Sequence, residues 1–108
     1  MRIGDIILIP FPYAELTHVK VRPAVVITQT EDKHKDMVVS AISSVIPNKL
    51  SKREFTITPN LTNKLRAVSV VKTDRIVTLK HEDKIADLGK LSGQELQVFK
   101  QILQEMIA

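Results

Sequence analysis

The grouping of apolar residues is the feature that most constrains the fold of this chain. Through the first three quarters of the sequence they form short runs, separated by prolines, asparagines and charged residues. Short runs of this kind are typical of β-strands, whereas a helical repeat appears only near the C-terminus. No stretch between the runs reads as a long crossover helix, which argues against a parallel α/β fold. The pattern predicts an antiparallel sheet followed by one helix.

Five strands are expected, and each has its own boundary signals. They are predicted at residues 5–11, 23–28, 37–45, 54–58 and 67–79. Pro23 has no backbone N–H, so it fits only at the start of a strand or at a sheet edge. The last run loses its apolar pattern at 72–74, where we expect a bend or a bulge. The segment 59–65, PNLTNKL, predicts a loop or a single helical turn.

The C-terminal segment carries a complete helix-start signal. Ser92 and Glu95 have the spacing of a capping box, and Leu91 and Leu96 that of a hydrophobic staple. The residues that then share one helical face are Leu96, Phe99, Ile102, Leu103, Met106 and Ile107. The whole pattern predicts a mainly β fold with α. We expect a small barrel or curled sheet with a C-terminal helix packed against it, in a single domain spanning residues 1–108.

Composition excludes several classes of function. The chain has no cysteine, so disulfides, thiolate nucleophiles and cysteine-based zinc sites are absent. His18, His34 and His81 show no paired ligand spacing, and we expect neither a metal nor a cofactor. No apolar segment approaches membrane-spanning length, and the N-terminus lacks the features of a signal peptide. We therefore expect a cytoplasmic protein with no membrane partner.

The positive charge is concentrated in the middle of the chain. The net charge is +4, but residues 49–75 contain seven basic and two acidic residues, a net charge of +5 for that segment alone. Clustered cations indicate an anionic partner, of which nucleic acid is the commonest. A solvated basic surface with no partner fits the charge equally well.

Arg22 is the first candidate functional residue. It lies in the segment HVKVRPAVVIT, residues 18–28, just before Pro23. A residue before proline is restricted to extended conformations, and the apolar strand that follows would hold Arg22 firmly. A guanidinium held in this way can offer a fork of donors to a phosphate. The alternative is a strand-end arginine that is solvated or paired with Glu15 or Asp36.

Three other residues, Ser43, Asp74 and Tyr13, allow both a structural and a functional interpretation. Ser43 lies near the end of the predicted strand 37–45, but hydroxyl residues are common in sheets. Asp74 interrupts an apolar run, so it marks a bulge or faces a ligand. We expect Phe11 to be a core residue, and Tyr13 to be either core or a surface on which a base stacks.

Five segments resemble a known family when they are taken in order. They are GDIILIPFPYAEL, VRPAVVIT, VVSAISS, VSVVKTDRIVTL and LGKLSGQELQVFKQIL. Over nearly the whole chain they resemble the PemK/MazF toxins of bacterial toxin–antitoxin pairs. The resemblance implies an SH3-like β-barrel of the plasmid-maintenance-toxin type and a homodimer. It also implies a metal-independent, sequence-selective endoribonuclease that cuts single-stranded mRNA and is inhibited by a cognate antitoxin.

The resemblance assigns roles to particular residues. It implies that Arg22 and Ser43 carry the cleavage. The residues expected to contact RNA are His18, Lys20, Lys49, Lys52, Lys72 and Asp74. Lys72 stands where many members have arginine, which keeps the charge but loses the bidentate fork. Ser43 replaces a more frequent threonine and keeps the hydroxyl. The segment 15–20, ELTHVK, lacks the glycines usual in better-known members, and these departures bear on base specificity more than on fold.

The chemistry that the resemblance implies uses the 2′-hydroxyl next to the scissile phosphate as nucleophile. Arg22 suits stabilisation of the developing negative charge, and Ser43 suits a hydrogen bond to a nonbridging oxygen. The general base stays open between His18, Asp74 and a group from a partner chain. Apolar residues in the loop of the third strand could supply a dimer interface: Val45, Ile46 and Leu50.

Two other functions remain open at this point. One is a non-catalytic toxin with the same barrel that acts by binding a protein target. The other is an RNA- or peptide-binding module without nuclease activity, which would bind RNA with steep salt dependence and leave it intact. A protein-binding toxin would not need Arg22 and Ser43 beside one phosphate-sized cleft, so their placement discriminates between the readings.

Overall fold

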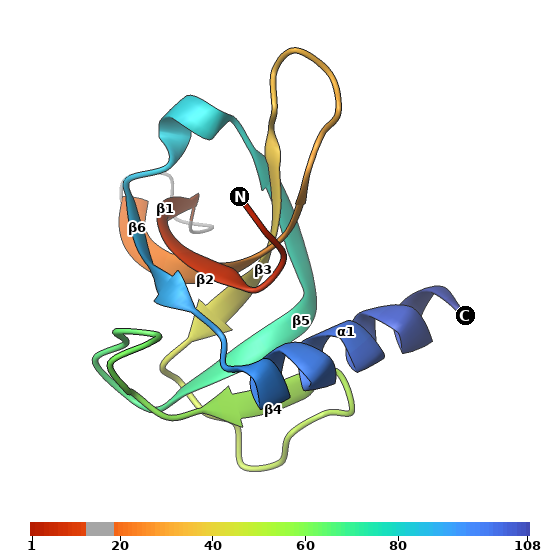
Figure 1. Cartoon of the computed structure of the whole chain (residues 1–108). Helices are drawn as coiled ribbons and strands as arrows, with labels where there is room; N and C mark the ends of the chain where they lie inside the picture. Colours follow the sequence, from red (N-terminus) through yellow and green to blue (C-terminus); the bar gives the residue numbers. More distant parts are fainter. Residues whose placement is uncertain (13–18) are drawn as a thin grey trace.

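The computed structural model describes residues 1–12 and 19–108, and its main feature is one strongly curled antiparallel sheet (Figure 1). The elements are β1 (Asp5–Pro12), β2 (Val19–Gln29), β3 (Met37–Ser43), β4 (Glu54–Ile57), β5 (Ser69–Leu79), η1 (His81–Asp83), β6 (Ala86–Lys90) and α1 (Gly93–Ile107). The order of strands across the sheet is β4-β5-β3-β2-β1-β6. This mostly β architecture with a C-terminal helix confirms the predicted fold class.

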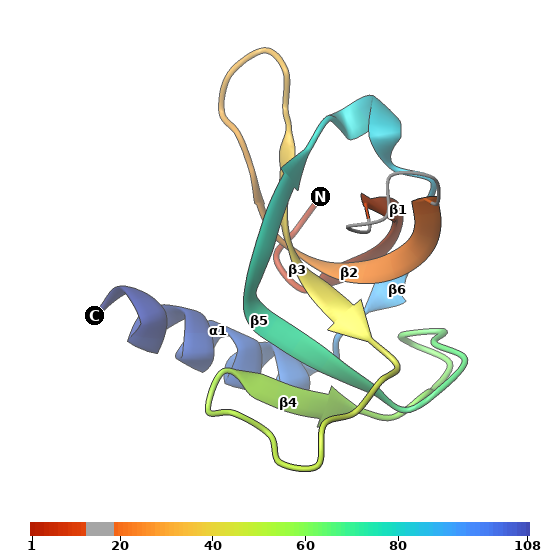
Figure 2. The same ribbon diagram turned by 180° about the vertical axis from the view of Figure 1, so that it is seen from behind.

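Irregular pairing explains why the sheet curls. Between Ser40 and Ala41 of β3, the partner residue on β5 jumps from Ile76 to Lys72, so three residues of β5 bulge out of the ladder. Bulges bend the strand that carries them and increase its twist. The sharp bend of β5 is visible from behind in Figure 2. The bulge predicted near 72–74 is therefore confirmed.

The two faces of the sheet bury separate apolar clusters. The first comprises Ile6, Val25, Ile42, Ile57, Val71, Leu91 and Phe99, and the second Ile7, Ile9, Ala24, Val26, Met37 and Val39. Successive residues, such as Ile6 and Ile7, alternate between the clusters because side chains of a strand alternate between its faces. Phe99 places α1 on the first cluster, and Phe11 packs against the second, as expected.

The helix begins where the sequence predicted. The Ser92 side chain accepts from the Glu95 backbone N–H, and the Glu95 side chain accepts from the Ser92 N–H, so both bonds of the capping box are present. Phe99 and Ile102 are buried. The prediction that Ile107 is part of the buried face is wrong: it is 85% exposed, and Figure 1 shows the C-terminal end of α1 running out beyond the sheet.

Two features of the sheet differ from the prediction. β2 starts at Val19, four residues before the expected start, and Pro23 lies inside it opposite Leu8 of β1. Pairing between β2 and β3 begins only at Ala24, so Pro23 lies beside β1 alone, where its missing N–H is tolerated. The strand β6 was not predicted, because its sequence ADLGK has no β-branched residue; pairing with β1 makes it a strand.

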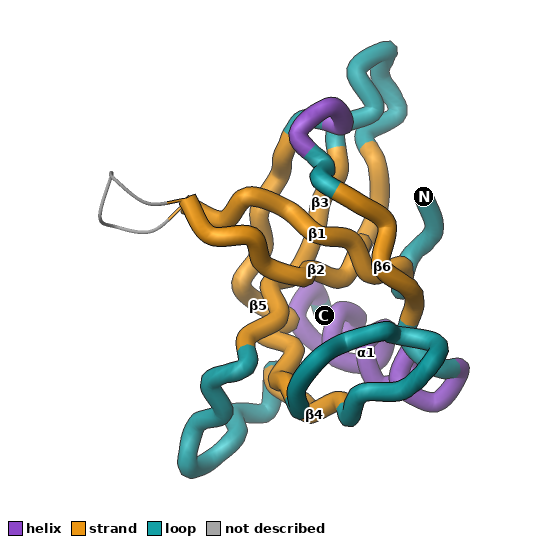
Figure 3. Tube along the Cα trace, turned by 90° about the vertical axis from the view of Figure 1, so that its left-hand side faces the viewer, coloured by secondary structure: helices purple, strands orange, loops and turns teal. Residues whose placement is uncertain are grey.

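The loop between β4 and β5 joins the two edges of the sheet. The Lys90 N–H of β6 donates to the Thr62 carbonyl oxygen at 3.1 Å. The buried Asn63 holds this loop: its Oδ1 accepts from the N–H groups of Asn60 and Leu65, and its Nδ2 donates to the Thr58 carbonyl. Figure 3 shows the loop below the curled strands. The open edges are thus bridged by an ordered connection.

No helix in residues 1–12 and 19–108 has the length and apolar character needed to cross a membrane.

Candidate active site

Arg22 and Ser43 are placed together by the register of β2 and β3. Ala24 pairs with Ala41 at the end of the ladder. Arg22 and Ser43 each lie two residues beyond this pair, so their side chains point to the same face of the sheet as those of Ala24 and Ala41. Two residues that are 21 positions apart in the sequence therefore lie on one face at neighbouring strand ends, and both line the same cavity.

Both residues line one cavity of about 270 Å³, which we call the Arg22–Ser43 cavity. It is lined by Phe11, Arg22, Ala41, Ile42, Ser43, Val45, Lys72 and Arg75. Three of these side chains are cationic, and among the described residues no carboxylate lines the cavity. A small concave site with converging cations and an apolar wall is suited to bind a phosphate group.

Ser43 keeps its hydroxyl proton available. Its Oγ accepts a hydrogen bond from the Val45 backbone N–H at 3.1 Å, which fixes the turn that ends β3. A serine hydroxyl carries one proton and two acceptor lone pairs. Because the bond to Val45 uses a lone pair, Ser43 can still donate its proton to an oxygen atom in the cavity.

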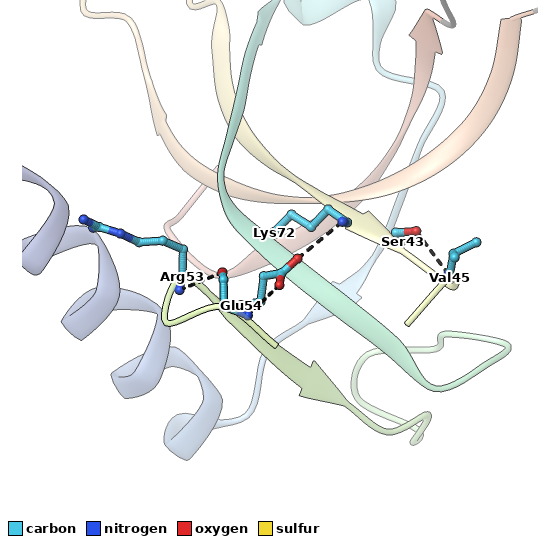
Figure 4. Close-up of polar contacts among 6 residues, drawn as sticks. Ser43, Val45, Arg53, Glu54 and Lys72 are labelled. Atoms are coloured by element: carbon cyan, nitrogen blue, oxygen red, sulfur yellow. Dashed lines mark hydrogen bonds and ion pairs between the residues drawn. The ribbon is translucent and has the colours of Figure 1, made fainter. Parts of the chain in front are cut away.

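Lys72 reaches the cavity as one partner of an ion pair. Lys72 and Glu54 are direct cross-strand partners on β5 and β4, and Lys72 Nζ lies 3.3 Å from Glu54 Oε2. In Figure 4 the Lys72 side chain extends from β5 towards the end of β3, where Ser43 lies, while Arg53 points away towards α1. Lys72 pairs with Ala41, so it shares the face of Ser43.

Glu54 is held as a carboxylate. The Ser51 backbone N–H donates to Glu54 Oε1 at 2.8 Å and is the main cause that keeps the pKa of Glu54 below its ordinary value of 4.5. Partial burial opposes this effect, and Lys72 adds to it. Glu54 therefore carries a negative charge at neutral pH and partly offsets the positive charge of Lys72 beside the cavity.

The bulge of β5 delivers Arg75 to the cavity and leaves Asp74 outside it. The Ser40 hydroxyl donates to the Thr73 carbonyl at 2.8 Å, and the Thr73 N–H donates to the Arg53 carbonyl at 3.2 Å. These bonds fix the bulge at its first residue. Arg75 lines the cavity, whereas Asp74 is exposed and is not among the lining residues.

A family model describing the PemK-like, MazF-like toxin of type II toxin–antitoxin systems matches residues 2–107. The chain belongs to this family. The family predicted from the sequence is therefore confirmed. Membership of a type II toxin family implies a cognate antitoxin as partner. Members of the family are generally endoribonucleases. No individual curated protein matches the chain.

The other RNA-binding residues predicted for this toxin lie outside the Arg22–Ser43 cavity or outside the described residues. Lys49 and Lys52 are exposed on the loop between β3 and β4. Lys20 is exposed on β2 opposite Phe11, on the same strand face as Arg22. His18 falls within residues 13–18, outside the described part of the chain.

Sequence reasoning did not single out Arg75 or Glu54. Arg75 was counted in the basic segment, but its approach to the cavity depends on the bulge that removes three residues from the ladder. Glu54 became relevant only through its register with Lys72. Among the described residues, no group of three or more histidine, aspartate and glutamate side chains is arranged to hold a metal ion.

Proposed function

We propose that this toxin is a metal-independent endoribonuclease that cleaves single-stranded mRNA sequence-selectively. The observation that carries the proposal is the joint presence of Arg22 and Ser43 in one small cavity, with Lys72 and Arg75 beside them. A protein-binding toxin has no need of this arrangement. The general activity of the family supports the same choice over a non-catalytic binding module.

The reaction begins with the 2′-oxygen next to the scissile phosphate. It attacks phosphorus as a general base removes its proton, and the bond from phosphorus to the 5′-oxygen breaks as that oxygen takes up a proton. The products are a 2′,3′-cyclic phosphate and a 5′-hydroxyl end. The protein has to hold the attacking and leaving oxygens in line and stabilise the negative charge that gathers on the nonbridging oxygens.

Arg22 stabilises that charge in our proposal. A guanidinium group has hydrogen-bond donors and no acceptor, so Arg22 can donate throughout the reaction and is unsuited to act as the base. Donors preorganised towards a developing charge are worth about 2.7–4 kcal/mol each in other enzymes. The Ser43 hydroxyl donates to one nonbridging oxygen, and Arg75 adds positive charge at the rim. None of the described lining residues is suited to be the general base, so its candidates are His18, the nearby Asp74 and a group from a partner chain.

The exposed cations and apolar residues fit two further parts of the proposal. Lys20, Lys49 and Lys52 contact the RNA backbone beyond the scissile phosphate.

The toxin forms a homodimer through the exposed apolar residues that follow β3, which are Val45 at 74%, Ile46 at 42% and Leu50 at 38% exposure. Because mRNA is the substrate, we propose that the toxin acts in the cytoplasm.

The test is cleavage of a long single-stranded RNA by the purified toxin in EDTA. We expect discrete fragments with 5′-hydroxyl ends. A matched RNA with a single 2′-deoxynucleotide at a mapped cut site should resist cleavage at that site alone. Intact RNA in the first experiment, or cleavage at the deoxynucleotide in the second, would contradict the proposed chemistry.

A further inference from the structure

A second cavity lies on the helix-side face of the sheet, and Arg22 and Ile42 line both it and the Arg22–Ser43 cavity. The second cavity has a volume of about 440 Å³, and we call it the Arg66 cavity. Its β2 residues, Val21 and Pro23, share the strand face of Val25, which belongs to the helix-side cluster. The two cavities thus approach each other from opposite faces of the sheet.

The cavities converge where β2 and β3 separate. The ladder between these strands ends at Ala24 and Ala41. Ile42 lies one residue beyond that last pair on β3 and Arg22 two residues beyond it on β2, and both contribute to both cavities. A ligand group held at Arg22 on one face is therefore next to the mouth of the other cavity.

The lining of the Arg66 cavity combines an apolar wall with cations. Leu8, Ile42 and Leu88 contribute to the wall, and Lys64 and Arg66 join Arg22 as cationic residues. Among the residues that the structure describes, no aspartate or glutamate lines this cavity. An apolar surface edged by hydrogen-bond donors and positive charge complements an unstacked nucleobase, which has an apolar face, an edge of acceptor atoms and an attached phosphate.

The wall that carries Lys64 and Arg66 is ordered in advance. It belongs to the loop that Asn63 holds through three hydrogen bonds to backbone groups. Lys64 has a φ of 56°, in the left-handed region, and its N–H donates to the Asn60 carbonyl at 2.9 Å. A wall that needs no reordering on binding loses less free energy when a ligand enters.

We infer that the Arg66 cavity receives the base of the nucleotide adjoining the scissile phosphate, and that it prefers bases with carbonyl-oxygen acceptors, guanine foremost. The inference rests on the proposed function, because Arg22 connects the cavity to the phosphate. Guanine presents O6 and N7 side by side, the pair of acceptors that an arginine fork matches. The cavity therefore contributes to the sequence selectivity of cutting.

The test measures binding by fluorescence anisotropy and does not require cleavage. The probes are short 2′-O-methyl RNA oligonucleotides, in which one position at a time is abasic. We expect the wild-type toxin to lose about tenfold in affinity at one abasic position, since stacking of a base is worth roughly this much. Ala67→Phe, which fills the cavity, should bind intact RNA about tenfold more weakly and become insensitive to that abasic position.

Arg66→Ala is the second variant and leaves the cavity open. It should lose the preference for guanine over adenine at the same position, whereas Lys100→Ala, which removes an exposed cation from α1, should retain it. If Ala67→Phe and Arg66→Ala both bind every oligonucleotide as the wild type does, the inference is wrong and the cavity is free for a protein partner. If the toxin nevertheless cleaves RNA and Arg22→Ala abolishes that cleavage, the proposed function remains supported. If the variants change binding as expected but the wild-type toxin cleaves no RNA, the inference about the cavity holds and the proposed nuclease function is wrong.

Discussion

Lys72 and Glu54 form an ion pair across β5 and β4, 3.3 Å between Nζ and Oε2, at the edge of the cavity that Arg22 and Ser43 line. The Glu54 side chain is only 12% exposed and that of Lys72 27%. The pair thus gives one cation of the proposed RNA site a carboxylate partner that the RNA phosphate has to displace or share.

Removing the carboxylate should strengthen RNA binding. Glu54→Gln frees the charge of Lys72, so we expect tighter binding at low salt. The plot of log affinity against log salt concentration should also become steeper by about 0.7, the value for one additional phosphate contact with a single strand. Anisotropy titrations at several salt concentrations measure both. The double variant Glu54→Gln, Lys72→Ala should return to a shallow slope; a slope for Glu54→Gln equal to that of the wild type would show that Lys72 does not contact RNA.

The same carboxylate should make stability sensitive to acid. The pKa of Glu54 is lowered in the folded state, so its contribution to the free energy of unfolding is complete above its ordinary value of 4.5 and is lost as the pH falls through the folded pKa. Glu54→Gln lacks this contribution at every pH. Urea unfolding between pH 7 and pH 3 should show the difference between wild type and variant shrinking below pH 4.5, and a constant difference would contradict the assignment.

Arg75 should matter more for cleavage than its neighbour Asp74. Arg75 lines the cavity, and Asp74 is exposed outside it. We expect Arg75→Ala to lower the cleavage rate by about tenfold or more, consistent with loss of a charge near the phosphate. Asp74→Ala should lower the rate less than Arg75→Ala does. A loss for Asp74→Ala that exceeds the loss for Arg22→Ala would assign the role of general base to Asp74 and would leave His18 without it.

Two glycines provide a matched test of how the sheet edges are joined. A Cβ atom on Gly89 would lie 2.1 Å from the Thr62 carbonyl oxygen, whereas one on Gly93 would meet nothing within 4 Å. Gly89→Ala should therefore destabilise the fold by about 1–3 kcal/mol, the usual cost of overpacking. Gly93→Ala, at the start of α1, should be neutral or stabilising. Thermal unfolding compares the two, and equal melting temperatures would show that the β4–β5 loop does not pack on β6 as described.

The elements with a strong local signal could be predicted from the sequence. The helix α1 was identified from the capping-box pair Ser92 and Glu95 and from its apolar repeat, because both depend on residues within one or two turns. The strands β1, β3, β4 and β5 followed from their apolar runs. The first residues of β2 and the whole of β6 are strands because they pair with β1. The local sequence of each segment does not indicate that pairing.

The candidate site was predictable only in part for the same reason. Arg22 was identified because it precedes Pro23 and because the chain resembles the family. Ser43 was identified because it lies near the end of a predicted strand. Their shared cavity depends on the register of β2 and β3, and the contributions of Arg75 and Glu54 depend on a bulge and on a cross-strand pair 18 positions apart. These relationships arise from contacts between strands that are distant in sequence, so the sequence of any one strand does not indicate them.

The most direct test of the account is a double-mutant cycle on the metal-free cleavage of one RNA by wild type, Arg22→Ala, Ser43→Ala and the double variant. Arg2→Ala, an exposed arginine at the N-terminus, is the control and should cut at the wild-type rate. If Arg22 and Ser43 hold one phosphate, Arg22→Ala should lower the rate constant by about 10²–10³. The double variant should then be little worse than the slower single variant, because groups that act on one phosphate are not additive. An Arg22→Ala rate within twofold of the wild type, or two losses that simply multiply, would contradict the shared site.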